Sequence, residues 1–109
     1  MDREKQIAVE LKKLQKLFAK IPDNKRKLCD GLLQNAAFMK VTLGELQAEI
    51  VAHGAMIEGQ SGNGFMTIRD NPAQKSYTTM IARYSGIINQ LLGLLPPEEA
   101  DDDPLKEFR

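Results

Sequence analysis

The chain has few of the residues from which catalytic and metal sites are usually built. Its 109 residues include one cysteine, one histidine and no tryptophan. A single cysteine cannot form an internal disulfide, which favours a reducing cytoplasm over a secreted setting. No apolar run approaches the ~20 residues that span a bilayer, and the first residues lack the apolar core of a signal peptide. We therefore expect a soluble intracellular protein without a membrane partner.

The chain also lacks net charge, because fifteen basic and fifteen acidic residues cancel. The two signs are nevertheless separated along the sequence. Residues 1–27 contain nine basic and four acidic residues, whereas residues 96–109 contain two basic and six acidic residues. This asymmetry favours a protein that binds macromolecules over a small-molecule enzyme.

The clearest structural signal is a long helix over residues 72–95. Asn71 is a typical N-cap, Pro72 suits the first helical position, and Pro96-Pro97 cannot continue the helix. One face of this helix is apolar and predicts the core of the fold. Its members are Tyr77, Met80, Ile81, Tyr84, Ile87, Ile88, Leu91 and Leu95.

The opposite face of the same helix carries small residues where a solvated helix usually carries charge. They are Thr79, Ala82, Gly86 and Gly93, with Lys75 at the same side. Each interior glycine costs about 1 kcal/mol of helix stability relative to alanine. We therefore predict that this stripe of small residues is an interface in a homo-oligomer. The alternative is that these are merely weak exposed positions.

Shorter helices precede the long one. Residues 2–21 predict a first helix whose inward face is Ile7, Leu11, Leu14, Leu17, Phe18 and Ile21. Pro22-Asp23-Asn24 ends it and begins a second helix, with apolar positions at Leu28, Leu32, Leu33, Ala36, Ala37 and Met39.

A capping box predicts a third helix. Thr42-Leu43-Gly44-Glu45 matches the box, so we expect a break at Val41-Thr42 and a helix that ends at Gly54 as a left-handed cap. Its inward residues would be Leu43, Leu46, Ile50 and Val51. One continuous, kinked helix is the alternative.

Residues 54–64 contain four glycines and predict a loop. A short hairpin that pairs Ala55–Glu58 with Phe65–Ile68 across these glycines is a further expectation. A phosphate-binding loop is the alternative, but the stretch lacks the Gly-Lys-Ser/Thr ending of a P-loop. Residues 96–109 are too acidic and too poor in apolar groups to fold alone. The predicted fold is thus an all-α bundle of three or four helices over residues 1–95, followed by a disordered acidic tail.

The candidate catalytic groups are sparse. His53 lies at a predicted helix C-terminus, where the helix dipole favours its positive charge, and Cys29 suits the core. A His53–Cys29 nucleophilic pair is the enzymatic alternative. No His, Cys or carboxylate residues cluster at metal-ligand spacing, so we expect no metal, no cofactor and no enzymatic activity.

A basic surface near the N-terminus is the strongest nucleic-acid signal. We predict that it binds DNA through Lys5, Lys12, Lys13, Lys16, Lys20, Lys25, Arg26 and Lys27. A solvated lysine face is the alternative. A helix-turn-helix with residues 43–53 as recognition helix is a second DNA hypothesis, but that helix carries Glu45 and Glu49 and no basic residue, so phosphates would repel it.

Several short motifs occur together in this order. Ile-Pro-Asp-Asn-Lys-Arg follows the first helix, Asn-Ala-Ala-Phe-Met and Thr-Leu-Gly-Glu-Leu lie in the middle, and Asp-Asn-Pro-Ala-Gln-Lys follows the glycine loop. Over roughly residues 11–95 this pattern resembles the small terminase subunits of tailed bacteriophages and of prophages in Gram-positive bacteria.

The resemblance implies a DNA-packaging protein. Small terminase subunits recognise viral DNA, assemble into rings, and recruit and regulate a large subunit that holds the ATPase and nuclease. It therefore implies a non-enzymatic homo-oligomer that binds double-stranded DNA in the cytoplasm of a bacterial host. Residues 1–95 contain no separate helix-turn-helix domain of the kind many small terminases carry.

We expect the large terminase subunit to bind the acidic tail, with Leu105 and Phe108 as apolar anchors. The alternative function is a helical phage structural or adaptor protein that binds only protein partners.

Overall fold

A computed structural model describes residues 2–60 and 62–96. Over these residues the fold is mainly helical, with one small antiparallel sheet. The elements are α1 (Arg3–Leu17), α2 (Asp23–His53), β1 (Met56–Gln60), β2 (Met66–Asp70) and α3 (Pro72–Leu94).

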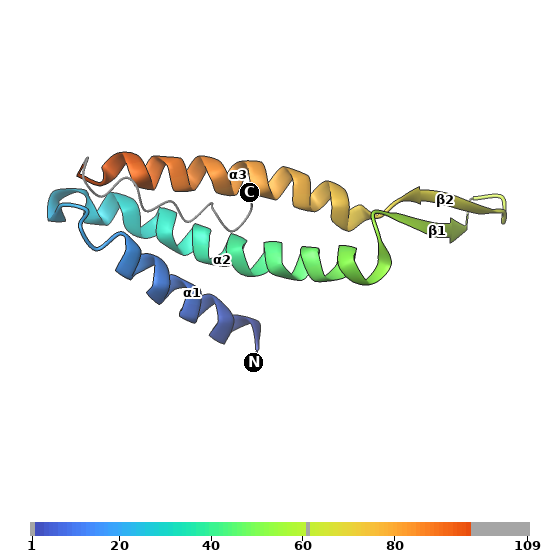
Figure 1. The fold of residues 1–109 in the computed structure, drawn as a ribbon, viewed down its shortest axis with the longest axis horizontal. Coiled ribbons are helices and arrows are strands. Elements are labelled where there is room, and N and C mark those ends of the chain that lie inside the picture. Colours follow the sequence, from blue (N-terminus) through green and yellow to red (C-terminus); the bar gives the residue numbers. More distant parts are fainter. Residues whose placement is uncertain (1, 61, 97–109) are drawn as a thin grey trace.

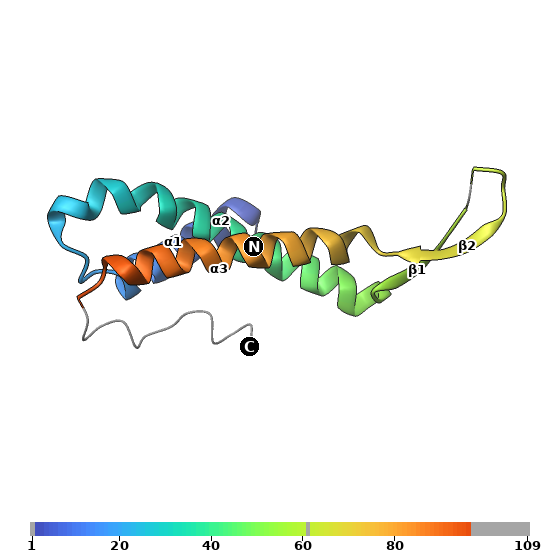
Figure 2. The ribbon, with the colours of Figure 1, turned by 90° about the horizontal axis from the view of Figure 1, so that it is seen from above.

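The molecule is long and narrow. α2 and α3 run antiparallel along its length, α1 packs on the first half of α2, and the hairpin extends past the helices at one end (Figure 1). Seen from above, α2 crosses α3 at a shallow angle (Figure 2). The extents are 59 × 27 × 20 Å and the radius of gyration is 17.5 Å, against about 13 Å for a compact domain of 100 residues. Much of each helix is therefore open to solvent.

α1 begins at the expected place but ends earlier than predicted. The Asp2 carboxylate accepts a hydrogen bond from the Lys5 amide at 2.8 Å, which caps the helix. The helix stops at Leu17 instead of residue 21, and the Arg26 guanidinium donates to the Ala19 carbonyl at 2.6 Å across the turn that follows. Phe18 and Ile21 are still buried, but Leu17 is 45% exposed and does not belong to the core.

α2 is one continuous helix, so the predicted break at Val41-Thr42 is wrong. The capping box does not form, because the Thr42 hydroxyl donates to the Phe38 carbonyl at 3.0 Å and Glu45 binds Arg3 at 3.0 Å instead. Without a turn at residue 42 there is no helix-turn-helix, which removes that DNA hypothesis.

Two apolar residues of α2 that were predicted to face the core are exposed instead. Leu28 is 76% exposed and Val51 is 86% exposed, because neither end of α2 is covered by another helix on that side. Leu33, Ala36, Ala37 and Leu43 are buried as predicted.

The hairpin forms, but with a different register from the one predicted. Met56 pairs with Asp70 and Gln60 pairs with Met66, so Ala55 and Phe65 lie outside the strands. The base fixes this register, since the Asn71 amide donates to the Ala55 carbonyl at 2.8 Å. Gly54 has φ 85° and ψ 169°, an extended conformation with positive φ that only glycine adopts readily, instead of the predicted left-handed cap.

α3 agrees closely with the sequence prediction. The Asn71 side chain accepts from the Ala73 amide at 3.0 Å, and the helix runs to Leu94. Its inward residues join α1 and α2 in one core. The buried members of this core are Leu14, Phe18, Ile21, Cys29, Leu33, Ala36, Ala37, Leu43, Tyr84, Ile88, Leu91 and Leu95.

Candidate nucleic-acid and subunit interfaces

Three lysines form a row on the outer face of α1. Lys5, Lys12 and Lys16 are exposed and lie within about 40° of one another at 100° per residue. They are opposite the buried Leu14 and span eleven residues, or about 16 Å of helix. A row of ammonium groups at this spacing suits a line of backbone phosphates.

The other predicted DNA-binding residues do not all join this row. Lys20 is exposed but lies beyond the end of α1, and Lys13 makes an ion pair with Glu10 at 3.5 Å. Arg26 is half-buried and lies 3.9 Å from Asp23, so its guanidinium holds the turn between α1 and α2. Lys25 and Lys27 are exposed within the first two turns of α2.

An open groove of about 460 Å³ separates α1 from α2. It is lined by Gln6, Val9, Glu10, Lys40, Val41, Gly44, Glu45 and Ala48. Partial burial lowers the pKa of Lys40, and the nearby charge of Glu10 opposes that effect. Sequence reasoning missed this groove, although Lys40 stands out as a lone cation in an apolar stretch.

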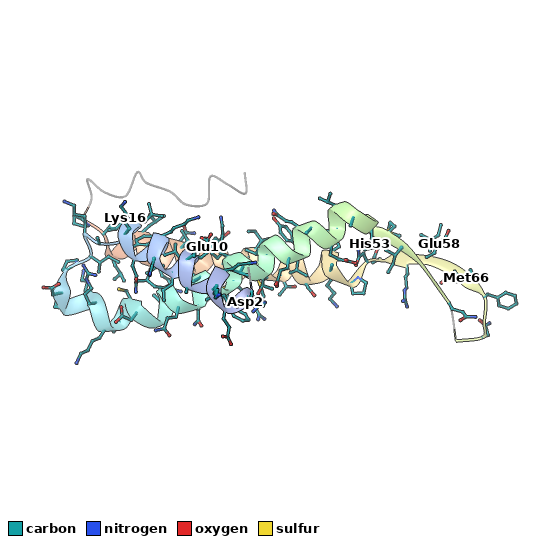
Figure 3. All side chains as sticks on the ribbon, turned by 90° about the horizontal axis from the view of Figure 1, so that it is seen from below. Asp2, Glu10, Lys16, His53, Glu58 and Met66 are labelled. Atoms are coloured by element: carbon teal, nitrogen blue, oxygen red, sulfur yellow. The ribbon has the colours of Figure 1, made fainter. Side chains whose placement is uncertain are left out.

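The charge of Glu10 also affects Tyr84 on α3. Burial raises the pKa of Tyr84 to about 12, and the negative charge of Glu10 contributes to the shift. The phenol therefore stays protonated at neutral pH. Figure 3 shows Glu10 and Lys16 on α1, at the opposite end of the molecule from Met66 on the hairpin.

The predicted oligomer stripe on α3 is open to solvent. Thr79, Ala82, Gly86 and Gly93 are all exposed. A Cβ atom added at Gly86 or Gly93 would meet no atom of the described residues within 4 Å. The space beside the two glycines is therefore free to admit another helix.

The hairpin carries an apolar surface that sequence reasoning did not identify. Met56, Met66 and Ile68 share one face of the sheet through the cross-strand pairing and are 53%, 65% and 72% exposed. Their cross-strand partners on that face are polar, namely Asp70, Gln60 and Glu58, so the apolar side chains are edged by two carboxylates. Phe65, next to the turn, is 70% exposed. On the opposite face of the sheet, the Arg69 side chain lies directly over Gly59. Alternation within Met66–Asp70 was the signal that could have identified this surface.

The distance between His53 and Cys29 excludes the nucleophilic pair that was the enzymatic alternative. Both residues lie on α2, 24 positions apart, which places them about 36 Å apart along the axis. The Cys29 thiol is 1% exposed and donates to the Arg26 carbonyl, as expected for a core residue. His53 binds the Glu49 carboxylate at 3.0 Å at the end of the helix.

Two further kinds of site are absent from residues 2–60 and 62–96, and one predicted site lies outside them. No group of three or more His, Cys, Asp or Glu residues there could hold a metal ion. No helix in the described part of the chain has the length and apolar character needed to cross a membrane. The predicted anchors Leu105 and Phe108 lie outside the described residues.

Comparison with protein-family models, curated proteins and solved structures finds no significant match.

Proposed function

We propose that the chain is a non-enzymatic, small terminase-like subunit that binds double-stranded DNA and recruits a large terminase subunit during viral DNA packaging. The observation that carries the DNA part is the lysine row, Lys5, Lys12 and Lys16, exposed on one face of α1. No carboxylate shares the arc between these lysines, so their field is not cancelled locally.

The row favours backbone contact over base recognition. Lysine ammonium groups act as point charges toward phosphates, and no aromatic side chain lies among them to stack on single strands. Binding would then be largely independent of DNA sequence and strongly dependent on salt. Exposed Lys25 and Lys27 on α2 extend the same surface in this proposal.

The test is the affinity for a labelled duplex measured by anisotropy at several salt concentrations. Each lost phosphate contact reduces the slope of log affinity against log salt by about 0.9. We expect the triple variant Lys5→Gln, Lys12→Gln, Lys16→Gln to lose roughly 3 units of slope and to bind different sequences equally weakly.

A matched control separates location from net charge. Lys12→Gln and Arg69→Gln each remove one positive charge, the first from α1 and the second from the hairpin. We expect only the Lys12 variant to change the slope. An unchanged slope in the triple variant would reject the lysine row as the DNA surface.

Oligomer formation is the second part of the proposal. The exposed small-residue stripe of α3 would receive a helix of a neighbouring copy, which would complete the helical bundle that the sequence predicts. Close approach of two helices is easiest where side chains are small, and Gly86 and Gly93 have open space beside them. Recruitment of the large subunit through Leu105 and Phe108 remains a prediction.

The hairpin supports the alternative function of a phage structural or adaptor protein. Its exposed Met66 and Ile68 suit a protein partner, because methionine and β-branched side chains bury well against protein, whereas the carboxylates of Glu58 and Asp70 on the same face would repel phosphate. Duplex binding that is absent even at low salt, with self-association retained, would favour this second function.

A further inference from the structure

A second groove lies between α2 and α3 and differs in charge from the first. Its volume is about 340 Å³, and it is lined by Met39, Lys75, Ser76, Thr79, Met80 and Arg83. Met39 and Met80 are half-buried and form an apolar floor, while Lys75 and Arg83 are exposed at its two ends. Neither cation makes an ion pair with another described residue.

The arrangement along the groove is regular. Lys75, Thr79 and Arg83 are spaced by four residues, so they form one row along α3. The two cations are eight residues apart, which is about 12 Å along the helix. Met80 lies between them along the helix axis, so the groove has a positive charge at each end and an apolar floor in the middle. This order fits an extended segment with acid, apolar and acid side chains on one side.

We propose that the groove is the docking site for residues 103–107 of this chain's own acidic tail. In an extended segment, side chains at alternate positions point to the same side. Asp103, Leu105 and Glu107 therefore present acid, apolar and acid groups together. The two carboxylates are four residues apart, or about 13 Å in an extended chain, which matches the separation of Arg83 and Lys75.

The length of the tail also fits. Arg83 lies twelve residues before Leu95 and Lys75 lies twenty before it, which are about 18 Å and about 30 Å along α3. Asp103 follows Leu95 by eight residues and Glu107 by twelve, so an extended tail reaches up to about 26 Å and about 40 Å. The tail can thus run back along α3 with Asp103 at Arg83 and Glu107 at Lys75.

The charges of the lining residues determine which of the two grooves suits an acidic segment. The groove between α1 and α2 contains the carboxylates of Glu10 and Glu45, which would repel an acidic segment. The α2–α3 groove contains two cations and no carboxylate. Exposed ion pairs contribute little individually, but groove and tail belong to one chain, so their effective concentration is in the millimolar range. Docking would hide Leu105 from any other partner.

The methyl groups of the groove floor provide a direct measurement. In the full chain with isotopically labelled methionine, Met39 and Met80 report on the groove by NMR, and Met56 and Met66 on the hairpin serve as internal controls. We expect Leu105→Ala to shift the Met39 and Met80 methyl resonances and to leave the hairpin resonances unchanged. Phe108→Ala is the matched control, because residue 108 points to the other side of the extended segment.

A charge exchange tests the register. Lys75→Glu with Arg83→Glu should shift the Met39 and Met80 resonances in the same way as Leu105→Ala. Adding Asp103→Lys and Glu107→Lys to that variant should return the Met39 and Met80 resonances toward their wild-type positions. Unchanged Met39 and Met80 resonances in Leu105→Ala, or failure of the exchange to restore them, would overturn the proposal. A shift that disappears on dilution would also overturn it, since the segment would then come from a second molecule.

Discussion

Asn71 connects the hairpin to the helices through a single buried side chain. It is 2% exposed, its oxygen accepts from the Ala73 amide at 3.0 Å, and its nitrogen donates to the Gly54 carbonyl at 2.9 Å. Gly54 follows the last residue of α2 and Ala73 lies in the first turn of α3, so both ends of the hairpin are held by this one residue. A cap residue alone needs only the first of these bonds.

The two bonds of Asn71 can be separated by substitution. Asn71→Ala loses both and should lower the free energy of unfolding by about 1 to 3 kcal/mol. Asn71→Asp keeps the cap oxygen, and aspartate caps helices as well as asparagine does. We nevertheless expect Asn71→Asp to be destabilised, because a carboxylate oxygen would face the Gly54 carbonyl.

Urea unfolding followed by circular dichroism measures these differences. Asn24→Ala, on the exposed first turn of α2, is the control and should change stability little. Wild-type stability for Asn71→Asp would show that the bond to Gly54 contributes nothing.

At the scale of elements, the hairpin differs from the helices in how it is supported. α2 is packed against both other helices, whereas the strands of the hairpin contact mainly each other. A two-stranded hairpin is marginally stable by itself in water. Its exposed apolar face gains nothing from the monomer, so its stability depends on what else covers it.

Hydrogen exchange should reveal this difference in support. In dilute protein we expect the amides of Met56–Gln60 and Met66–Asp70 to exchange much faster than those of Ala36–Leu43 in α2, because local opening of the hairpin exposes little buried surface. Mass spectrometry of peptic fragments measures both regions in one experiment. Equal protection of hairpin and helix at every concentration would contradict this expectation.

At the scale of the whole molecule, the elongated shape leaves one long side of α3 without a neighbour among residues 2–60 and 62–96. The small-residue stripe lies on that side, and we expect it to hold another copy. The pair Gly86→Leu with Gly93→Leu should block close approach and reduce the particle mass measured by light scattering. The same two substitutions should also stabilise α3, by about 1 kcal/mol for each glycine replaced, because glycine is a poor helix former.

Gly31→Leu provides the control for helix propensity. Gly31 is an exposed interior glycine of α2 with nothing within 4 Å of an added Cβ, and it lies outside the stripe. It should gain stability without a change in mass. Wild-type mass for the Gly86 and Gly93 double variant would eliminate the stripe as the interface.

The sequence determined the features that depend on local chemistry. The Asn71-Pro72 start of α3, its apolar face around Tyr84, and the buried Cys29 follow from capping, proline geometry and helical period, which act over a few residues. The helical period also placed Lys5, Lys12, Lys13, Lys16 and Lys20 opposite the apolar residues of the first helix, but the end of α1 at Leu17 separates Lys20 from the others.

Only the tertiary structure decided features that depend on contacts between distant segments. Glu45 could cap a helix at Thr42 or bind Arg3, and the packing of α1 on α2 selects Arg3, which leaves α2 unbroken. The hairpin register was set by Asn71 bonding to Ala55, a contact sixteen positions away. Exposure of Leu28 and Val51, and the two basic ends of the α2–α3 groove, likewise follow from where the helices stop covering one another. Periodicity assigns each residue to a face of its own helix, whereas burial depends on whether another element lies against that face.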